Sequence, residues 1–553
     1  MLLKINNFFR QNRELILILL AASILFFYNL GNMSLWEDEA ETAVLAKNIL
    51  KTGLPHAWDG KNIVTQEFGR DSNNNNIWIY HPWLSHYISA LSMKIIGTSN
   101  WALRFPFTLF GFLTIPLLYS FSLFISKNKR IAVHSSLLLA FSIQFILYSR
   151  QLRYYSLTAF FSTLLLYSYT KLIMFPKKRY IFGTILSLIL LFYSNHITAI
   201  AIGLGIFIHY LIFNRNKINF NTILAILILS FAFTLPWLMF SNASKHIEIS
   251  SITIYISKFI HLLLDLNMIF PIVFIIILSP FIIKNKLKEE QWLLIIPVLS
   301  LIITYSFIPV FPRGRYLVPV YPLLFTGIAW MILKFKENST FYIATLTFLL
   351  FTNIFSLIPG LILKNIPHFP KEISKIYFNK IKYYYNDYVH ELTKKYDGPI
   401  EGIVRFLKNN ANPNQTIFVN YEAEPIIFYT DLKVLRIIPF LNPPDWIVLR
   451  KNKISPYADD NYDFKCVLLR SIFMPQKIKW NSSPSQTQDD LNIRHNKKYI
   501  KHILNKYNYL PIELPYPNIP YENLPDIEFH QFETVKNAPN LIIYKRINYK
   551  EET

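Results

Sequence analysis

Residues 35–53 read LWEDEAETAVLAKNILKTG and follow directly after the first long apolar segment of the chain. The stretch contains two adjacent carboxylates, Asp38 and Glu39. The spacing of the apolar residues after them predicts a short surface helix that begins at this acid pair. Acids at a helix start stabilise it by a few tenths to about 1 kcal/mol and need no other function. Whether the pair has a chemical role therefore depends on the rest of the chain.

The composition predicts a mainly α, polytopic membrane protein. The chain has 553 residues, of which 52% are hydrophobic, and its mean hydropathy is +0.27. Apolar blocks recur from Leu15 to Leu363, each close to the roughly 20 residues needed to cross a bilayer. After Pro367 the sequence becomes polar. We expect a membrane domain over 1–365 and a soluble α/β domain over 366–553. About eleven spans are expected, at 14–30, 101–126, 131–149, 154–174, 180–195, 197–213, 220–240, 262–283, 291–308, 316–334 and 341–362.

The distribution of basic residues predicts the orientation of these spans. With the N-terminus inside, Lys and Arg fall on every second connection, as the positive-inside rule requires; the groups lie at 4–13, 127–130, 171–179, 215–217, 284–288 and 334–336. This places the C-terminal domain and the first long loop, 31–100, outside the cytoplasmic (inner) membrane. The net charge of +22 then reflects loops that face anionic lipids. No basic stripe with interleaved aromatics indicates nucleic-acid binding. Cys466 is the only cysteine, which excludes an intrachain disulfide and CxxC metal sites.

Four arginines lie on the outer side, against the topological bias. Arg150 and Arg153 stand three apart in YSRQLRYYS, and Arg313 and Arg315 flank a glycine in FPRGRYLVP. Residues three apart on a helix share a side, and arginine grips phosphate oxygens in two-point fashion. Alternatively, these arginines pair with nearby acids or reach lipid headgroups. Pairing with acids and binding phosphate are compatible.

The first outer loop supplies further groups to the same side. Its second amphipathic piece, HPWLSHYISALSMKIIG (81–97), begins with His81, and tyrosines including Tyr316 rim the expected cavity. Long loops with helices along the membrane surface commonly build sites there. Carboxylates beside arginines suit transfer of a sugar from a polyprenyl-phosphate donor, with a carboxylate as general base. The spacing of His56, His81, Asp59 and Glu67 matches no metal-ligand pattern, so neither a metal nor a cofactor is expected.

Five stretches in order resemble bacterial C-type membrane glycosyltransferases of the protein O-mannosyltransferase and aminoarabinose lipid A transferase type. They are residues 35–53, 81–97, WALRFPFTLFGFLTIPLLY (101–119), SRQLRYYSLTAFF (149–161) and RGRYLVPVYPLL (313–324). The resemblance covers roughly residues 30–330. It implies a C-type glycosyltransferase fold, a polyprenyl-phosphate-linked sugar donor, membrane lipids as surroundings, and a glycan, lipid or protein as acceptor.

The resemblance also implies roles for single residues. Asp38 and Glu39 match the family's catalytic acid pair, with Asp38 as the base and Glu39 orienting it or holding an arginine. Arg315 and Tyr316 match a pair near the donor phosphate; the other matching residues are His81, Arg150 and Arg153. The chain departs from the aminoarabinose type at Glu41, where relatives have arginine, and at His81, where they have lysine. It also lacks an aspartate in YYSLTAFF (154–161). These departures leave the sugar open.

Two other classes compete with a transferase. A transporter or flippase of lipid-linked sugars predicts charges within the spans and paired broken helices, but the spans carry few charges, with Asp265 the main candidate. A membrane scaffold would not require acids and arginines on one side. In the C-terminal domain, GIVRFLKNN (402–410) predicts a helix and TIFVN (416–420) a strand. We expect Glu422 and Glu424 to be surface acids and His530 to be structural.

Overall fold

The computed structural model describes most of the chain. The described residues are 12–65, 71–241, 252–271, 287–308, 313–333, 339–357, 383–436, 442–450, 503–504, 506–519, 523–527, 530–535 and 538–547. Cys466 and Glu67 lie outside these ranges, as does the expected domain division at residues 365 and 366.

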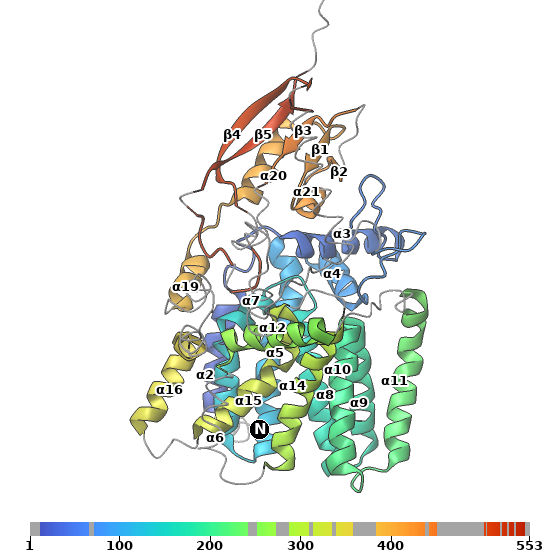
Figure 1. The fold of residues 1–553 in the computed structure, drawn as a ribbon, viewed down its shortest axis with the longest axis vertical. Coiled ribbons are helices and arrows are strands. Elements are labelled where there is room, and N and C mark those ends of the chain that lie inside the picture. Colours follow the sequence, from blue (N-terminus) through green and yellow to red (C-terminus); the bar gives the residue numbers. More distant parts are fainter. Residues whose placement is uncertain are drawn as a thin grey trace, which may run out of the picture.

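Long helices form a bundle, and a small sheet lies beyond one end of it (Figure 1); we call this the sheet end. The helices of the bundle are α2 Arg13–Phe27, α5 Asn100–Ser126, α6 Lys129–Ala140, α7 Ile143–Ser149, α8 Tyr155–Met174, α9 Lys178–Ser194, α10 His196–His209 with the π-helix η1 Tyr210–Asn214, α11 Phe220–Ser241, α12 Ile252–Ile269, α14 Glu289–Phe307, the 3-10 helix η3 Gly314–Val320, α15 Tyr321–Ile332, α16 Ser339–Phe351 and the 3-10 helix η5 Ile354–Leu357.

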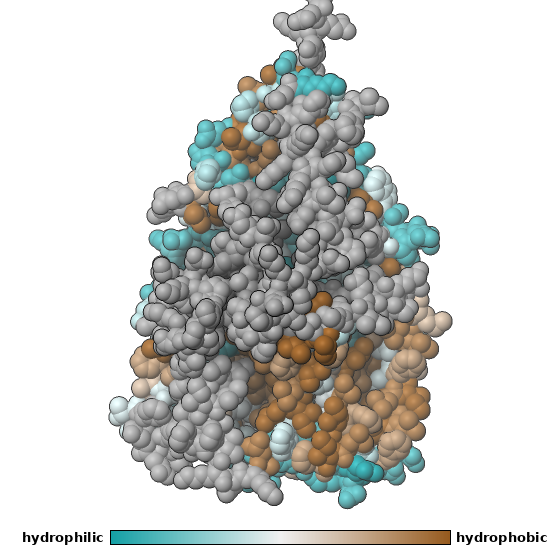
Figure 2. Space-filling model, viewed as in Figure 1, coloured by the Kyte–Doolittle hydropathy of each residue, from teal (hydrophilic) through white to brown (hydrophobic). Residues whose placement is uncertain are grey.

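The protein is a multi-pass membrane protein. Within the described ranges, six helices are long and apolar enough to cross a membrane, or seven if α6 and α7, bent by 64°, count as one span. The expected number of about eleven is not confirmed: α2 and α9 have 15 and 17 residues, and 272–283, the second half of the expected eighth span, lies outside the described residues. Figure 2 shows apolar residues over the bundle and hydrophilic ones at its far end and around the sheet.

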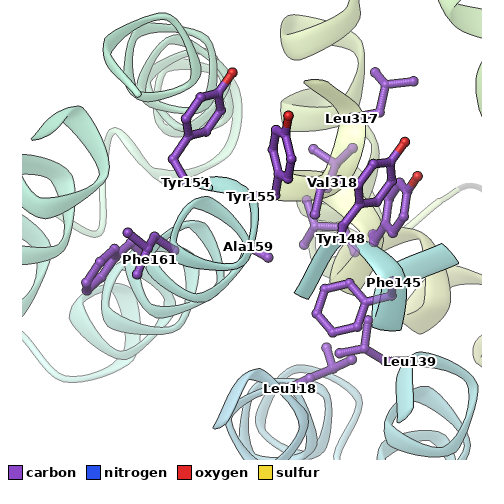
Figure 3. Packing of buried hydrophobic residues seen from close by; sticks show 14 of the residues in the cluster. Leu118, Leu139, Phe145, Tyr148, Tyr154, Tyr155, Ala159, Phe161, Leu317 and Val318 are labelled. Carbon is purple, nitrogen blue, oxygen red and sulfur yellow. The ribbon is translucent and has the colours of Figure 1, made fainter. Parts of the chain in front are cut away.

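The core of the bundle is aliphatic and aromatic, but it becomes polar toward the sheet end. Figure 3 shows Phe145, Leu118 and Leu139 packed together, while the rings of Tyr148 and Tyr155 point their hydroxyls the opposite way. The rings of Tyr148 and Tyr155 meet edge to face, with centroids 5.5 Å apart. Tyrosine suits this place because its ring packs in the core while its hydroxyl needs a polar partner.

Two short helices lie across the sheet end of the bundle, α3 Glu37–Thr52 and α4 Leu84–Ile95. The predicted helix after the acid pair is confirmed as α3, which ends at Gly53 in the left-handed conformation (φ 83°). It is not a surface helix, because residues 39–46 are all buried, where α3 packs against α4 and α21 Ala423–Tyr429. Helix α3 thus packs against the C-terminal part of the chain on one side and against α4, at the end of the bundle, on another.

The C-terminal part contains a five-stranded sheet in the order β2-β1-β3-β5-β4. Strands β1, β2 and β3 are parallel, and β5 pairs antiparallel with both β3 and β4. The predicted strand at TIFVN and helix at GIVRFLKNN are confirmed as β1 and α20. The elements are α19 Tyr384–Thr393, α20 Pro399–Asn410, β1 Thr416–Val419, β2 Lys433–Leu435, β3 Trp446–Val448, β4 Tyr509–Pro517 and β5 Asn540–Arg546.

Candidate active site

Two arginines from distant parts of the chain converge on Asp38 in the first turn of α3. The carboxylate oxygen Oδ2 of Asp38 lies 3.0 Å from a terminal nitrogen of Arg315 and 3.8 Å from one of Arg153. The same Arg315 nitrogen donates to the hydroxyl of Tyr155 at 3.1 Å. The Asp38 side chain is 17% exposed, whereas the two arginine side chains are 6–7% exposed. A reachable carboxylate therefore lies beside two largely desolvated positive charges.

Arg153 is fixed to the start of α3 by several hydrogen bonds. One terminal nitrogen donates to the Asp38 carbonyl at 2.9 Å, to the Glu41 carboxylate at 2.8 Å and to the Thr42 hydroxyl at 3.0 Å. Burial raises the pKa of Glu41 to about 8, although the Arg153 charge acts in the opposite direction. The helix start and the arginine thus hold each other in place.

Glu39 has a different environment from its neighbour. Its side chain is fully buried and receives two hydrogen bonds from Arg104 of α5, at 2.8 and 2.6 Å. The Leu152 amide donates to Glu39 at 2.8 Å and the Trp36 amide donates to it at 3.4 Å. Glu39 therefore caps the start of α3, whereas the Asp38 carboxylate faces Arg315 and Arg153. Arg104 engages both Glu39 oxygens, which agrees with the expectation that Glu39 holds an arginine beside Asp38.

Arg150 does not face Asp38 together with Arg153, contrary to the expectation that the two arginines lie on one side. Its guanidinium donates to the carbonyls at the end of α2, those of Phe26 at 3.1 Å, Tyr28 at 2.9 Å and Asn29 at 3.1 Å. Residues 150–154 lie between α7 and α8 rather than within one helix, so spacing by three does not put the two side chains on one side.

His81 and Tyr316 border the site through aromatic contacts. The His81 ring lies 5.3 Å from Tyr154, and burial together with the Arg153 charge lowers the pKa of His81 well below its usual value. A neutral imidazole can donate or accept one hydrogen bond but does not add a cation for phosphate. Tyr316 stacks on Tyr305 at 4.9 Å. Arg313 precedes η3, and its carbonyl accepts from the Tyr316 amide at 3.1 Å.

A C-terminal segment, residues 523–527, reaches this end of the bundle and was missed by sequence reasoning. Asn523 donates to the Ser34 carbonyl at 3.2 Å, and the Tyr148 hydroxyl donates to Asp526 at 2.8 Å. Its five residues, NLPDI, carry no local signal for such a contact. Arg104 was missed as well, although an arginine inside the apolar run WALRFPF was a usable signal.

A small polar cavity lies behind the Glu39–Arg104 pair. His530 and Glu391 line it, 2.7 Å apart, together with Asn29, Asn32, Met33, Leu30, Leu147, Gln151, Arg104, Arg150 and Asn523. His530 hydrogen-bonds to the Glu391 carboxylate at 2.7 Å and to the Leu524 carbonyl at 2.9 Å, which fits the structural role expected for it. Within the described ranges, no group of three or more His, Cys, Asp or Glu side chains is arranged to hold a metal ion.

Glu422 and Glu424 are not surface acids. Their side chains are 1% and 0% exposed and pair with Arg450, at 2.7 Å, and with Arg436. Acids are rarely buried, which favours a position on the surface, but each of these two has an arginine partner that makes burial tolerable.

Comparison with known proteins supports this description of the fold. Residues 80–240 match the family described as dolichyl-phosphate-mannose-protein mannosyltransferase. An uncharacterized protein of Aquifex aeolicus is 32% identical over 171 residues, which span 31% of this chain and 32% of that protein. The chain thus aligns with about a third of the length of that relative.

Solved structures with the same fold include ArnT from Cupriavidus metallidurans. The alignment with its structure bound to undecaprenyl phosphate covers 79% of this chain and 93% of the ArnT chain, with 13% identity and a TM-score of 0.50. The alignment with the apo structure covers 96% of this chain and 97% of the ArnT chain, with 12% identity and the same TM-score. The resemblance to C-type membrane glycosyltransferases expected from the sequence motifs is confirmed, and the chain has an ArnT-like fold.

Proposed function

We propose that this membrane protein, with its ArnT-like fold, is a glycosyltransferase that moves a sugar from a polyprenyl-phosphate donor to an acceptor. The observation that carries the proposal is the Asp38 carboxylate beside Arg315 and Arg153. The mannosyltransferase family match over residues 80–240 supports it, as does the undecaprenyl phosphate bound by ArnT. The acceptor is a lipid A or other lipopolysaccharide glycan, or a protein.

In this reaction Asp38 takes a proton from the acceptor hydroxyl or amine. The acceptor atom forms a bond to the anomeric carbon of the sugar, and the bond from that carbon to the phosphate oxygen breaks. The bonding electrons leave with the polyprenyl phosphate, whose added negative charge is stabilised by Arg315 and Arg153. The proton remains on the Asp38 carboxyl until it is lost to solvent, which reaches this partly exposed side chain.

We place the reaction at the outer face of the cytoplasmic membrane, with the C-terminal domain outside the cytoplasm. Helix α2 begins toward the end of the bundle remote from the sheet (Figure 1), and the basic loops predict that end to be inside. Asp38 belongs to α3, which lies at the opposite end (Figure 1) and packs against α21 of the C-terminal part. Polyprenyl phosphates are the sugar donors suited to that side of the membrane.

The variant Asp38→Asn tests the proposal because it keeps the side-chain shape but cannot accept the proton. In a strain lacking the gene, the wild-type protein should restore the missing sugar mass on lipid A, glycans or proteins. Asp38→Asn at equal membrane level should not restore it, and the control Asp431→Asn, an exposed acid, should. Full restoration by Asp38→Asn rules out Asp38 as the base.

A further inference from the structure

The segment 523–527 is built into the sheet end of the bundle by a two-point clamp. The side-chain amide of Gln144, in α7, donates to the Pro525 carbonyl at 2.7 Å and accepts from the Ile527 amide at 2.9 Å. Gln144 is 4% exposed, so both hydrogen bonds are shielded from water. The segment between these two residues is therefore held in a defined position against α7.

This clamp presents Asp526 to the candidate site. Its Oδ1 accepts from the Tyr148 hydroxyl at 2.8 Å, and a Cβ on Gly314 would lie 3.9 Å from that oxygen. Its Oδ2 is buried and has no hydrogen-bond partner among the described residues. The charge of Asp526 interacts with that of Arg315, yet within the described ranges no ion pair shorter than 4.0 Å joins them. Asp526 is thus near Arg315 but does not form an ion pair with it.

In a glycosyl phosphate donor, the phosphate is attached directly to the sugar ring. When Arg315 holds the phosphate, the ring must lie within a few ångströms of that arginine. A carboxylate in contact with the phosphate would repel it, whereas a carboxylate beside the ring accepts hydrogen bonds from sugar hydroxyl or amino groups. A carboxylate oxygen that is close to Arg315 but outside ion-pair contact fits the second position.

We propose that Asp526 binds a hydroxyl or amino group of the donor's sugar through Oδ2 and contributes to the choice of sugar. The C-terminal part of the chain would then supply a specificity-determining residue to a site whose other charged groups come from the bundle and α3. This inference rests on the proposed function, because it requires a sugar phosphate at Arg315.

The isosteric variant Asp526→Asn provides the sharpest test. The amide oxygen can keep the hydrogen bond from Tyr148, which places an N–H₂ donor where Oδ2 was. Binding to the full-length protein in nanodiscs is measured for undecaprenyl phosphate and for undecaprenyl phosphate carrying mannose or 4-aminoarabinose. We expect Asp526→Asn to weaken the best-bound glycosylated donor by roughly ten-fold or more, the loss of one charge-assisted hydrogen bond, and to leave bare undecaprenyl phosphate within two-fold.

Three further variants separate this role from alternatives. Arg315→Ala should weaken the bare and glycosylated lipids alike, Asp526→Glu should recover part of the lost affinity, and Glu533→Gln, an acid 66% exposed in the same C-terminal region, should change neither. Equal weakening of bare and glycosylated lipids by Asp526→Asn would overturn the proposal in favour of a structural role. Tighter binding of both the bare and the glycosylated lipids would also overturn the proposal, because it would show that the Asp526 carboxylate competes with the phosphate for Arg315.

The same measurements separate this inference from the proposed function. If the wild type binds glycosylated donors better than the bare lipid, Asp526→Asn removes the difference, and no acceptor is modified, the sugar contact stands and the transferase proposal fails. If the wild type transfers a sugar and Asp526→Asn alters neither donor affinity nor donor preference, the transferase proposal stands and the role of Asp526 fails. A wild type that binds all three lipids equally also overturns the role of Asp526.

Discussion

Asp38 and Glu39 are neighbours in the chain, yet their carboxylates have different environments. Successive residues on an α-helix are about 100° apart around its axis, which is enough to turn one acid toward Arg315 and the other toward Arg104. Asp38 remains partly exposed at 17%, whereas Glu39 is fully buried. Adjacent residues of the same chemical type thus serve separate purposes, one proposed to be chemical and the other structural.

Removal of Arg104 should destabilise the protein because Glu39 would be left buried without its ionic partner. The cost of breaking a buried pair in this way is about 3–5 kcal/mol. We expect Arg104→Ala to lower the melting temperature in detergent markedly, while Arg130→Ala, which removes an exposed arginine, should leave it nearly unchanged. An Arg104→Ala protein that melts with the wild type would show that the pair adds no stability.

At the scale of elements, Arg150 ties the α7–α8 connection to the end of α2, and we expect this role to be structural. It satisfies carbonyls at the end of α2, which have no partner within that helix. We expect Arg150→Ala to cost at least about 2 kcal/mol of stability but to leave undecaprenyl phosphate affinity unchanged in protein that remains folded. Arg315→Ala should do the reverse. If Arg150→Ala lost as much donor affinity as Arg315→Ala, Arg150 would have to be a phosphate-binding residue.

Close packing of α10 against α14 depends on one glycine. A Cβ on Gly205 would lie 2.7 Å from the Cα of Pro297, whereas a Cβ on Gly203 would meet its nearest atom, on Leu188, at 3.7 Å. Small residues allow membrane helices to approach closely, and overfilling such a contact costs about 1–3 kcal/mol. Gly205→Ala should therefore lower the melting temperature, and Gly203→Ala should not. Equal melting temperatures for the two variants would contradict this packing.

At the scale of the whole molecule, the sheet domain meets α3 through buried charged groups. Burial and the nearby Glu424 charge raise the pKa of Glu37 well above its usual value, and burial raises the pKa of Glu422 to about 7 against the attraction of Arg450. Both acids bind protons more tightly in the folded protein than in the unfolded chain. Their contribution to stability is therefore full below about pH 4.5 and is lost as the pH rises through the folded pKa.

This linkage predicts that the folded protein loses stability between pH 5 and pH 8. For Glu422 the loss is on the order of 3 kcal/mol, and it should appear as a falling melting temperature across that range. Glu422→Gln should flatten the pH profile, while Glu513→Gln, which changes an exposed acid, should leave the slope as in the wild type. An unchanged slope in Glu422→Gln would show that this carboxyl does not bind the proton.

The sequence by itself determined the membrane class, the helix that follows the acid pair, parts of the C-terminal sheet and the candidacy of Asp38, Arg153 and Arg315. Hydropathy, helical periodicity and motif order are properties of short stretches, so they can be recognised without the fold. Only the tertiary structure decided which arginine meets which acid. Asp38 and Arg315 are 277 residues apart in the chain, and Tyr148 and Asp526 are 378 apart. Such pairs depend on how helices and loops pack together, because packing brings together groups that no local pattern connects.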